Sequence, residues 1–329
     1  ESGDPAHQGE GYDGYFKADD DDLNVRFHRM KQRYGVDPQY PLSRYVKGFR
    51  DARVPDREGE HTITTGANGQ RVISNYIGTA RCTNPLFAMN LPRGNPDEEL
   101  CNLAKGPRSP DLVFFAVVGG VPNKLLHFDP AGTEAATENN RITPEDWVKI
   151  IGTNPEAYDY TGIDPHMIQS VEPRPEIGKS VGDPDAPRGD NGTDPVHGRE
   201  WNTKKKDLQY ACTFDLYSEG KAIERSCVGN ADSCDCADDP SKPGVPAGNA
   251  PLCKTDGSAT QVKAKAYPTT REFQVVHSLG DQGIISSLCP IQLDDPSKPT
   301  YGYRPAVAAI IDRLKNALTT QCLPQKLRS

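Results

Sequence analysis

Cysteines and acidic residues are the side chains of this sequence that could do chemistry. Four cysteines, Cys227, Cys234, Cys236 and Cys253, share one loop rich in proline, glycine and aspartate, with six, one and sixteen residues between them. Zinc sites pair cysteine and histidine ligands at short fixed spacings, and thioredoxin-type redox centres need CxxC. This loop contains no histidine, and the chain contains no CxxC. The spacing therefore predicts disulfide bonds, which persist in an oxidising compartment.

The remaining cysteines allow two specific pairings to be predicted. Cys82 and Cys101 bracket a turn-rich segment, and closing it would stabilise the fold by roughly 3 kcal/mol in the chain-entropy model. Cys289 ends the last predicted strand and Cys322 follows the last predicted helix, so we expect these two to pair. Since the chain has nine cysteines, at least one is a free thiol or bonds another chain.

Two acidic clusters could bind Ca²⁺, which takes several oxygen ligands from a turning backbone. One is the run from Asp19 to Asp22. The other, which is the calcium candidate of this sequence, consists of Asp232, Asp235, Asp238 and Asp239. Neither cluster matches the spacing of an EF-hand loop, and acidic runs are usually solvated surface. A solvated loop is therefore the alternative to a calcium site.

A third acidic segment, GDPDAPRGDNGTDPVHG at 182–198, also contains a histidine. A metal-assisted hydrolase could use aspartate and histidine from one loop to activate water. The residues that would do so are Asp183, Asp185, Asp190, Asp194 and His197. The alternative is a surface loop with turns at its Asp-Pro pairs.

Hydrophobic periodicity predicts the helices that would position these residues. Apolar residues at helical spacing predict a helix over 23–34 and a second one starting near Pro41. Thr143 as N-cap, followed by Pro144, predicts a helix that ends at Gly152. Toward the end of the chain, EFQVVHSLG and AVAAIIDRL predict two more helices, the second of them amphipathic.

Short β-rich runs predict the strands. The most apolar stretch, DLVFFAVVGGVP at 111–122, predicts a strand buried on both faces, as in the middle of a parallel or mixed sheet. DLQYACTFDL at 207–216 and GIISSL at 283–288 predict two further strands. A buried strand, a helix, another buried strand and a closing helix form a right-handed α/β unit.

These segments resemble the C-terminal half of a von Willebrand factor A-type (vWA) domain. DLVFFAVVGGVP is similar to a strand near the centre of that sheet, and EFQVVHSLGDQGIISSLC with AVAAIIDRL is similar to its last helix, last strand and closing helix. Uncharacterised secreted or lipoprotein-like proteins of myxobacteria and acidobacteria contain segments similar to RYGVDPQYPLSRYV, DLVFFAVVGGVP, GREWNTKKKDLQYAC and QCLP of this chain. The resemblance implies an α/β, vWA-like (Rossmann-type) mixed sheet with long disulfide-stapled loop insertions.

The resemblance also implies that the N-terminal half of the vWA-like domain is missing from this sequence. A vWA domain usually holds Mg²⁺ through DxSxS after its first strand, and this chain contains neither DxSxS nor a candidate for that strand before Asp111. No residue here is therefore assigned to that metal site. We expect this chain to be the C-terminal part of a larger domain, with a sheet completed by residues outside it.

The expected organisation has two parts. Residues 1–22 form a mobile acidic arm, and residues 23–329 form a single vWA-like α/β domain with insertions at 153–206 and 217–260. A net charge of −8 argues against nucleic acid and anionic membranes as partners. No apolar run approaches the roughly 18 residues of a membrane span.

These observations predict a non-catalytic, extracytoplasmic binding, scaffold or structural-assembly protein, either secreted, periplasmic or on the cell surface. Its partner would be another protein, a second copy, or the missing half of its own domain. The alternatives are a metal-dependent hydrolase that uses the 183–197 loop and an accessory subunit of a cell-surface complex.

Overall fold

The computed structural model of the chain describes residues 23–35, 37–56, 59–91, 100–126, 142–177, 196–203, 205–229, 234–236, 250–256 and 258–321. The fold is mixed α/β, with small sheets, long connections and several disulfide bonds. The helices are α1 (Leu23–Tyr34), α2 (Leu42–Arg50), α4 (Pro144–Ile151), α5 (Thr270–Leu279) and α6 (Arg304–Gln321). The strands of the first half are β1 (Arg53–Pro55), β2 (His61–Thr65), β3 (Arg71–Tyr76), β4 (Ala80–Thr83) and β5 (Phe115–Gly119). Those of the second half are β6 (Cys212–Asp215), β7 (Tyr217–Ser218), β8 (Lys221–Ala222), β9 (Arg225–Ser226), β10 (Thr260–Gln261), β11 (Lys263–Ala266) and β12 (Gly283–Ser287).

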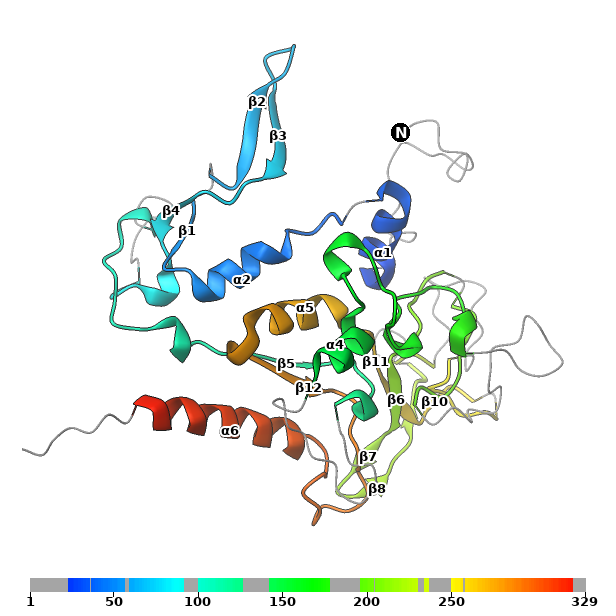
Figure 1. Cartoon of the computed structure of the whole chain (residues 1–329). Helices are drawn as coiled ribbons and strands as arrows, with labels where there is room; N and C mark the ends of the chain where they lie inside the picture. The colour runs from blue at the N-terminus through cyan, green and yellow to red at the C-terminus, as the bar shows by residue number, and fades with distance from the viewer. Residues whose placement is uncertain are drawn as a thin grey trace, which may run out of the picture.

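The centre of the molecule is a parallel pair of strands, β5 and β12, with residues 115–119 in register with 283–287. Helix α5 directly precedes β12 and packs on one face of the pair, while α6 follows β12 and lies on the other face (Figure 1). Parallel neighbours need a long crossover, and here the chain from 120 to 282 supplies it. Within the described residues this sheet has two strands.

The apolar core lies between this sheet and helices α4 and α5. Phe273 and Val276 of α5 are buried against Ile285 of β12, and Phe115 and Val117 of β5 pack partly buried against the same side. Helix α2 then covers α5 on its outer side. Burying a side chain such as Phe273 stabilises the fold by roughly 1.5–3 kcal/mol.

Two glycines allow the close backbone contacts of this core. A Cβ on Gly120 would overlap the carbonyl oxygen of Tyr267, and a Cβ on Gly283 would overlap that of Val276. The segment after β11 therefore lies directly against the end of β5, and α5 lies directly against the start of β12.

Several predictions from periodicity and capping are confirmed. Helix α1 is followed by Gly35 with φ +67°, and α2 starts directly after Pro41. Helix α4 has the expected cap, because the Thr143 side chain accepts from the backbone N–H of Asp146 and the Asp146 carboxylate accepts from that of Thr143. These features depend on residues close in sequence, which explains why they could be predicted.

The prediction that the strand at 111–122 is buried on both faces is wrong for the described residues. Ala116 and Val118 of β5 are exposed, while Phe115 and Val117 are half-buried. Strands also precede Asp111, but they form two separate antiparallel pairs, β1 with β4 and β2 with β3. The β2–β3 hairpin projects away from the core (Figure 1).

The disulfides confirm one predicted pairing and correct the other. Cys82 bonds Cys101, as expected. Cys289, however, bonds Cys212 at the start of β6, so the predicted Cys289–Cys322 pair is wrong. Helix α6 runs for 18 residues, or about 27 Å, away from the end of β12, and Cys322 would follow its far end. Cys322 itself lies beyond the described residues.

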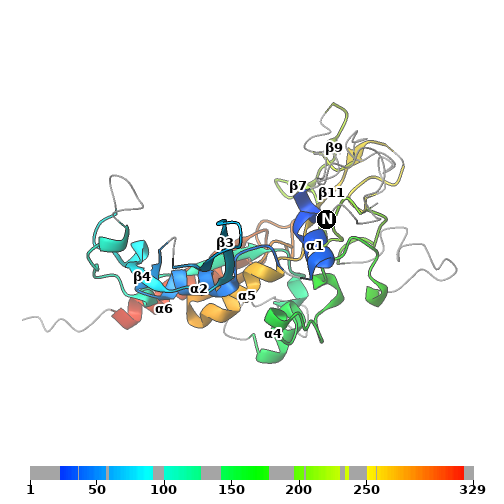
Figure 2. The ribbon, with the colours of Figure 1, turned by 90° about the horizontal axis from the view of Figure 1, so that it is seen from above.

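Cysteines of the predicted loop also pair, Cys227 with Cys234 and Cys236 with Cys253. Together with β6–β11 they form a compact region that we call the stapled module, defined as the described residues between 196 and 268. It lies to one side of α2, α5 and α6 (Figure 2). None of the described helices combines the length and the hydropathy needed to cross a membrane. The predicted arm, residues 1–22, is not among the described residues.

Candidate functional site

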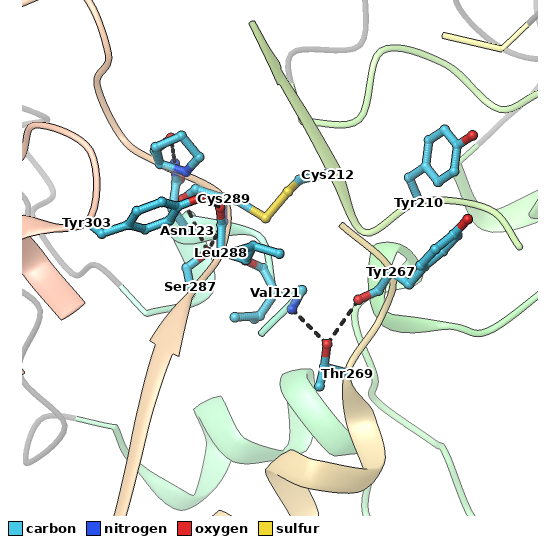
Figure 3. The surroundings of a disulfide bond; sticks show 12 residues. Val121, Asn123, Tyr210, Cys212, Tyr267, Thr269, Ser287, Leu288, Cys289 and Tyr303 are labelled. Atoms are coloured by element: carbon cyan, nitrogen blue, oxygen red, sulfur yellow. Dashed lines mark hydrogen bonds between the residues drawn. A yellow bond between two sulfur atoms is a disulfide. The ribbon is translucent and has the colours of Figure 1, made fainter. Parts of the chain in front are cut away.

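The carboxyl ends of β5 and β12 form the edge at which open α/β sheets bind their ligands. Hydrogen bonds within the protein occupy this edge (Figure 3). The Ser287 hydroxyl donates to the carbonyl of Val121 at 2.5 Å, and the Asn123 amide donates to the carbonyl of Pro290 at 3.1 Å. The turn after β5 is thereby bonded to the turn after β12.

The stapled module closes the same edge from the other side. The Thr269 hydroxyl accepts from the backbone N–H of Gly120 at 2.7 Å and donates to the carbonyl of Tyr267 at 3.1 Å (Figure 3). The Cys212–Cys289 disulfide joins β6 of the module to the residue after Leu288. We therefore assign this edge a structural role, as the joint between sheet and module.

A buried acidic residue, Asp207, organises the interior of the stapled module. Its carboxylate accepts from the Tyr267 hydroxyl at 2.6 Å and from the Tyr210 hydroxyl at 3.4 Å. Burial, followed by the negative charge of Asp207, raises the pKa of both tyrosines, so both stay protonated as donors. The Lys265 ammonium lies 3.5 Å from Asp207 and 2.6 Å from the carboxylate of Asp235.

Asp235 is the member of the calcium candidate that the structure describes, and Lys265 pairs with its carboxylate. Asp232, Asp238 and Asp239 fall outside the described residues, so the calcium site stays a prediction. The sequence around the last two, DDPSKP at 238–243, occurs again at 294–299. In that second copy the Asp295 carboxylate accepts from the backbone N–H of Ser297 at 2.9 Å and from its hydroxyl at 2.6 Å. The second copy thus uses its aspartate to cap a turn.

His197, from the hydrolase alternative, is fully buried. Its Nε2 lies 2.6 Å from Glu200, and Glu200 also binds the buried Arg174 guanidinium at 2.6 Å. Burial acts to raise the pKa of Glu200, but the hydrogen bonds from His197 and Arg174 outweigh it and lower this pKa below its ordinary value. Arg174 also donates to the carbonyl of Tyr210, so these side chains tie the 166–177 segment to the module.

The four aspartates of that alternative, Asp183, Asp185, Asp190 and Asp194, are not described by the structure. A G-x-S-x-G pattern around Ser180 lies in the same stretch. A nucleophile elbow places this pattern directly after a strand. The residues that precede it here form a short 3₁₀ helix, Pro175–Ile177, so we give the pattern no role.

The described residues bring one group of metal-ligand types together, Asp56 with Cys82 and Cys101. The two cysteines are bonded to each other and offer no thiolate. This group therefore has a single usable ligand, the Asp56 carboxylate.

The most prominent surface for a partner is the side of the sheet that α6 leaves uncovered. Side chains alternate along a strand, so Ala116 and Val118 point to the α6 side while Phe115 and Val117 point to the α5 side. Helix α6 packs on β12, whose residues are all buried, but leaves Val118 40% exposed.

Helix α6 itself has an exposed apolar flank. Its buried side chains include Ala306 and Ala309, whereas Val307, Ile311 and Leu314 are 53%, 44% and 42% exposed. These three lie at positions i, i+4 and i+7 and form one stripe along the helix. We call Ala116, Val118 and this stripe the uncovered sheet surface.

The uncovered sheet surface includes a strand edge that no other described strand pairs with. The carbonyl of Gly119 accepts from the N–H of Leu288, which lies on the β12 side of β5. The carbonyl of the next residue, Gly120, accepts from the N–H of Thr269 on the opposite side. Alternate residues of a parallel strand bond to opposite edges. The backbone N–H and C=O groups of Ala116 and Val118 therefore point to the edge away from β12.

The sequence already contained a signal for this surface. The apolar residues of this helix cover an arc that is wider than one packing face needs; they are Ala306, Val307, Ala309, Ile310, Ile311 and Leu314. Such an arc indicates a helix that is covered on two sides.

Comparisons with protein-family models, with curated proteins and with solved structures each found no match for this chain.

Proposed function

We propose that this chain is a non-catalytic binding or scaffold protein of an extracytoplasmic compartment, and that its partner docks on the uncovered sheet surface. The observation that carries this proposal is the edge of β5, which pairs with no further strand among the described residues and carries the exposed Val118; the exposed α6 stripe adds apolar surface on the same side of the sheet. An edge strand with free N–H and C=O groups is a template for pairing with another strand.

The oxidising compartment is supported by the cysteines. Eight of the nine cysteines form four disulfide bonds, and these bonds persist where no thiol-reducing system acts. Alkylation of the unreduced native protein, followed by intact-mass measurement, should label at most one thiol. Labelling of most cysteines would overturn this part of the proposal.

The partner we favour is a strand followed by a helix, supplied by a partner subunit. The strand would pair with the free groups of Ala116 and Val118. The helix would lie beside α6 and cover Val307, Ile311 and Leu314. This geometry is the ordinary way in which a parallel sheet acquires cover on both faces.

Site-specific photo-crosslinking in the producing cells tests the proposal. A benzoylphenylalanine at Val118 should crosslink to one discrete species, whose mass shows whether it is a second copy or a different protein. The matched control is the same residue at Val72 on the β2–β3 hairpin, which is similarly exposed at 45%. Equal or absent crosslinking at the two positions would overturn the proposed docking surface.

A further inference from the structure

A second, separate surface has the features of a ligand site. Two adjoining cavities of about 340 and 350 Å³ lie along α5. The first lies between α5, the segment at 37–43 and the loop at 155–160. The second lies between α5, α4 and the loop at 152–156. Pro155, Glu156 and Gln274 line both, so the two cavities form one groove.

Gln274 is the polar side chain at the junction of the two cavities. It is 8% exposed, and its amide makes no hydrogen bond to any of the residues that the structure describes. The amide atoms are not among the fully buried polar atoms without a partner, so water in the cavities reaches them. Because Gln274 lines both cavities, a ligand in the groove would replace that water as the partner of its amide.

The walls of the first cavity are tyrosines held in place by other groups. Tyr40, Tyr158 and Tyr160 are 44%, 50% and 40% exposed. The Tyr158 hydroxyl accepts from the backbone N–H of Asp37 at 2.9 Å. Arg271 bonds the Asp37 carboxylate and the carbonyl of Tyr40, which fixes the 37–40 segment to α5.

The guanidinium of Arg44 completes this arrangement, because it stacks on the Tyr40 ring with 3.9 Å to the centroid. Burial, and after it the nearby Tyr158 and Asp37, raises the pKa of Tyr160, which therefore remains a protonated donor. Walls fixed in advance lower the entropic cost of binding.

The second cavity repeats the combination of an aromatic wall and a polar group. Trp147 of α4 and His277 of α5 lie with ring centroids 4.8 Å apart. At the junction, the exposed Glu156 carboxylate makes no ion pair within the described part of the chain. The groove thus offers aromatic walls, hydrogen-bond donors, the negative charge of Glu156 and, in the first cavity, the positive charge of Lys31.

We propose that this groove binds an extended, proline-rich peptide segment with a basic residue, and that Gln274 donates to one of its main-chain carbonyls. A polyproline II segment has no internal hydrogen bonds, and its proline residues offer carbonyl acceptors but no N–H donors. Aromatic-lined grooves recognise such segments by packing against proline rings. Glu156 would then pair with the basic residue.

The test uses a synthetic ten-residue peptide of prolines and alanines with one arginine near its N-terminus. Binding to the whole, disulfide-bonded chain is measured by isothermal titration calorimetry. The same peptide with every proline replaced by glycine is the ligand control, and we expect at least tenfold weaker binding. Equal affinity for the two peptides would contradict recognition of polyproline II.

Two variants test the residues. Gln274→Met keeps the size of the side chain and removes the amide, so it should weaken binding by about tenfold, the value of one hydrogen bond of about 1.4 kcal/mol. It should leave the thermal midpoint unchanged, because the amide makes no hydrogen bond to the residues that the structure describes. Tyr158→Ala should weaken binding more, while Tyr303→Ala, a similarly exposed tyrosine on the α6 side, should have no effect.

Two results would overturn the proposal. One is a Gln274→Met variant that loses stability and keeps its affinity, since Gln274 would then be a structural residue. The other is binding of a soluble oligosaccharide in place of the peptide, tested in the same titration, because sugars also stack on tyrosine rings. Either result would leave the proposed docking on the uncovered sheet surface intact, since the two surfaces share no residue.

Discussion

The α/β core and the stapled module bury their interiors with different chemistry. The core cluster contains no cysteine and consists of Val121, Leu126, Ile150, Ile151, Met167, Ala211, Phe273, Val276 and Ile285. In the module cluster half of the buried members are disulfide-bonded cysteines, beside Trp201, Tyr210, Ala250 and Leu252. The core is stabilised by apolar packing between regular elements, and the module by covalent bonds and a polar network.

The difference follows from how much regular structure each region has. The core is built from helices of eight to eighteen residues and five-residue strands. The module contains four strands of only two residues, β7 to β10. Short strands cannot bury enough apolar surface to offset the conformational entropy of ordering their loops. Disulfides reduce that entropy in the unfolded chain instead.

The largest expected effect comes from breaking the joint between the two regions. Replacing both members of the Cys212–Cys289 bridge with serine should cost about 4.5 kcal/mol, because the bond closes a loop with a sequence separation of 77 residues. We expect calorimetry to show two separate transitions in the double variant, one for each region. A single transition with an unchanged midpoint would show that the joint does not depend on this bond.

A core substitution should be costly in a way that does not depend on redox state. Ile285→Ala removes a side chain on β12 that is 3% exposed, and should lower the free energy of unfolding by about 3 kcal/mol. The loss should be the same with and without reductant, as measured by urea unfolding. A loss that disappears on reduction would mean that the core folds only when the module is stapled.

A short loop within the module should contribute less. Serine at both Cys227 and Cys234 opens a bond with a separation of seven residues, for an expected loss of roughly 2.5 kcal/mol in the same entropy model. Hydrogen exchange should speed up in β9, which directly precedes Cys227, and in its paired strand β10, and stay unchanged in β5 and β12. Faster exchange in β12 would contradict the independence of the two regions.

The smallest expected effect is the loss of stability that Glu200 causes as the pH falls. The pKa of Glu200 is lower in the folded protein than its ordinary value of 4.5, so its charged form stabilises the fold above pH 4.5. This stability is lost as the pH falls below 4.5 toward the folded pKa. Glu200→Gln should therefore be less stable than the parent at pH 7 and show a flatter pH profile below 4.5. If the stability of the variant and that of the parent fell in parallel below pH 4.5, Glu200 would not be the cause of the loss of stability in acid.

Local sequence determined much of this fold. The caps at Thr143 and Gly35, the helix start after Pro41 and the helices α5 and α6 all follow from residues within a few turns of each other. The bonded state of the cysteines also followed from sequence, because no spacing fitted a metal or a redox motif. The short hairpins β2–β3 and β7–β8 did not stand out, since their strands are brief and largely exposed.

Tertiary structure alone decided which distant groups meet. Sequence placed Cys289 at the end of a strand, but only the return of β6 to that point selects Cys212 as its partner. Sequence marked β5 as apolar, but exposure of Val118 depends on what packs beside it. Likewise, the sequence shows Gln274 only as a polar residue on a helix, and the tertiary structure places it between α4 and the 155–160 loop. Helix periodicity is set within a few residues, whereas pairing and burial depend on where segments far apart in the chain come together.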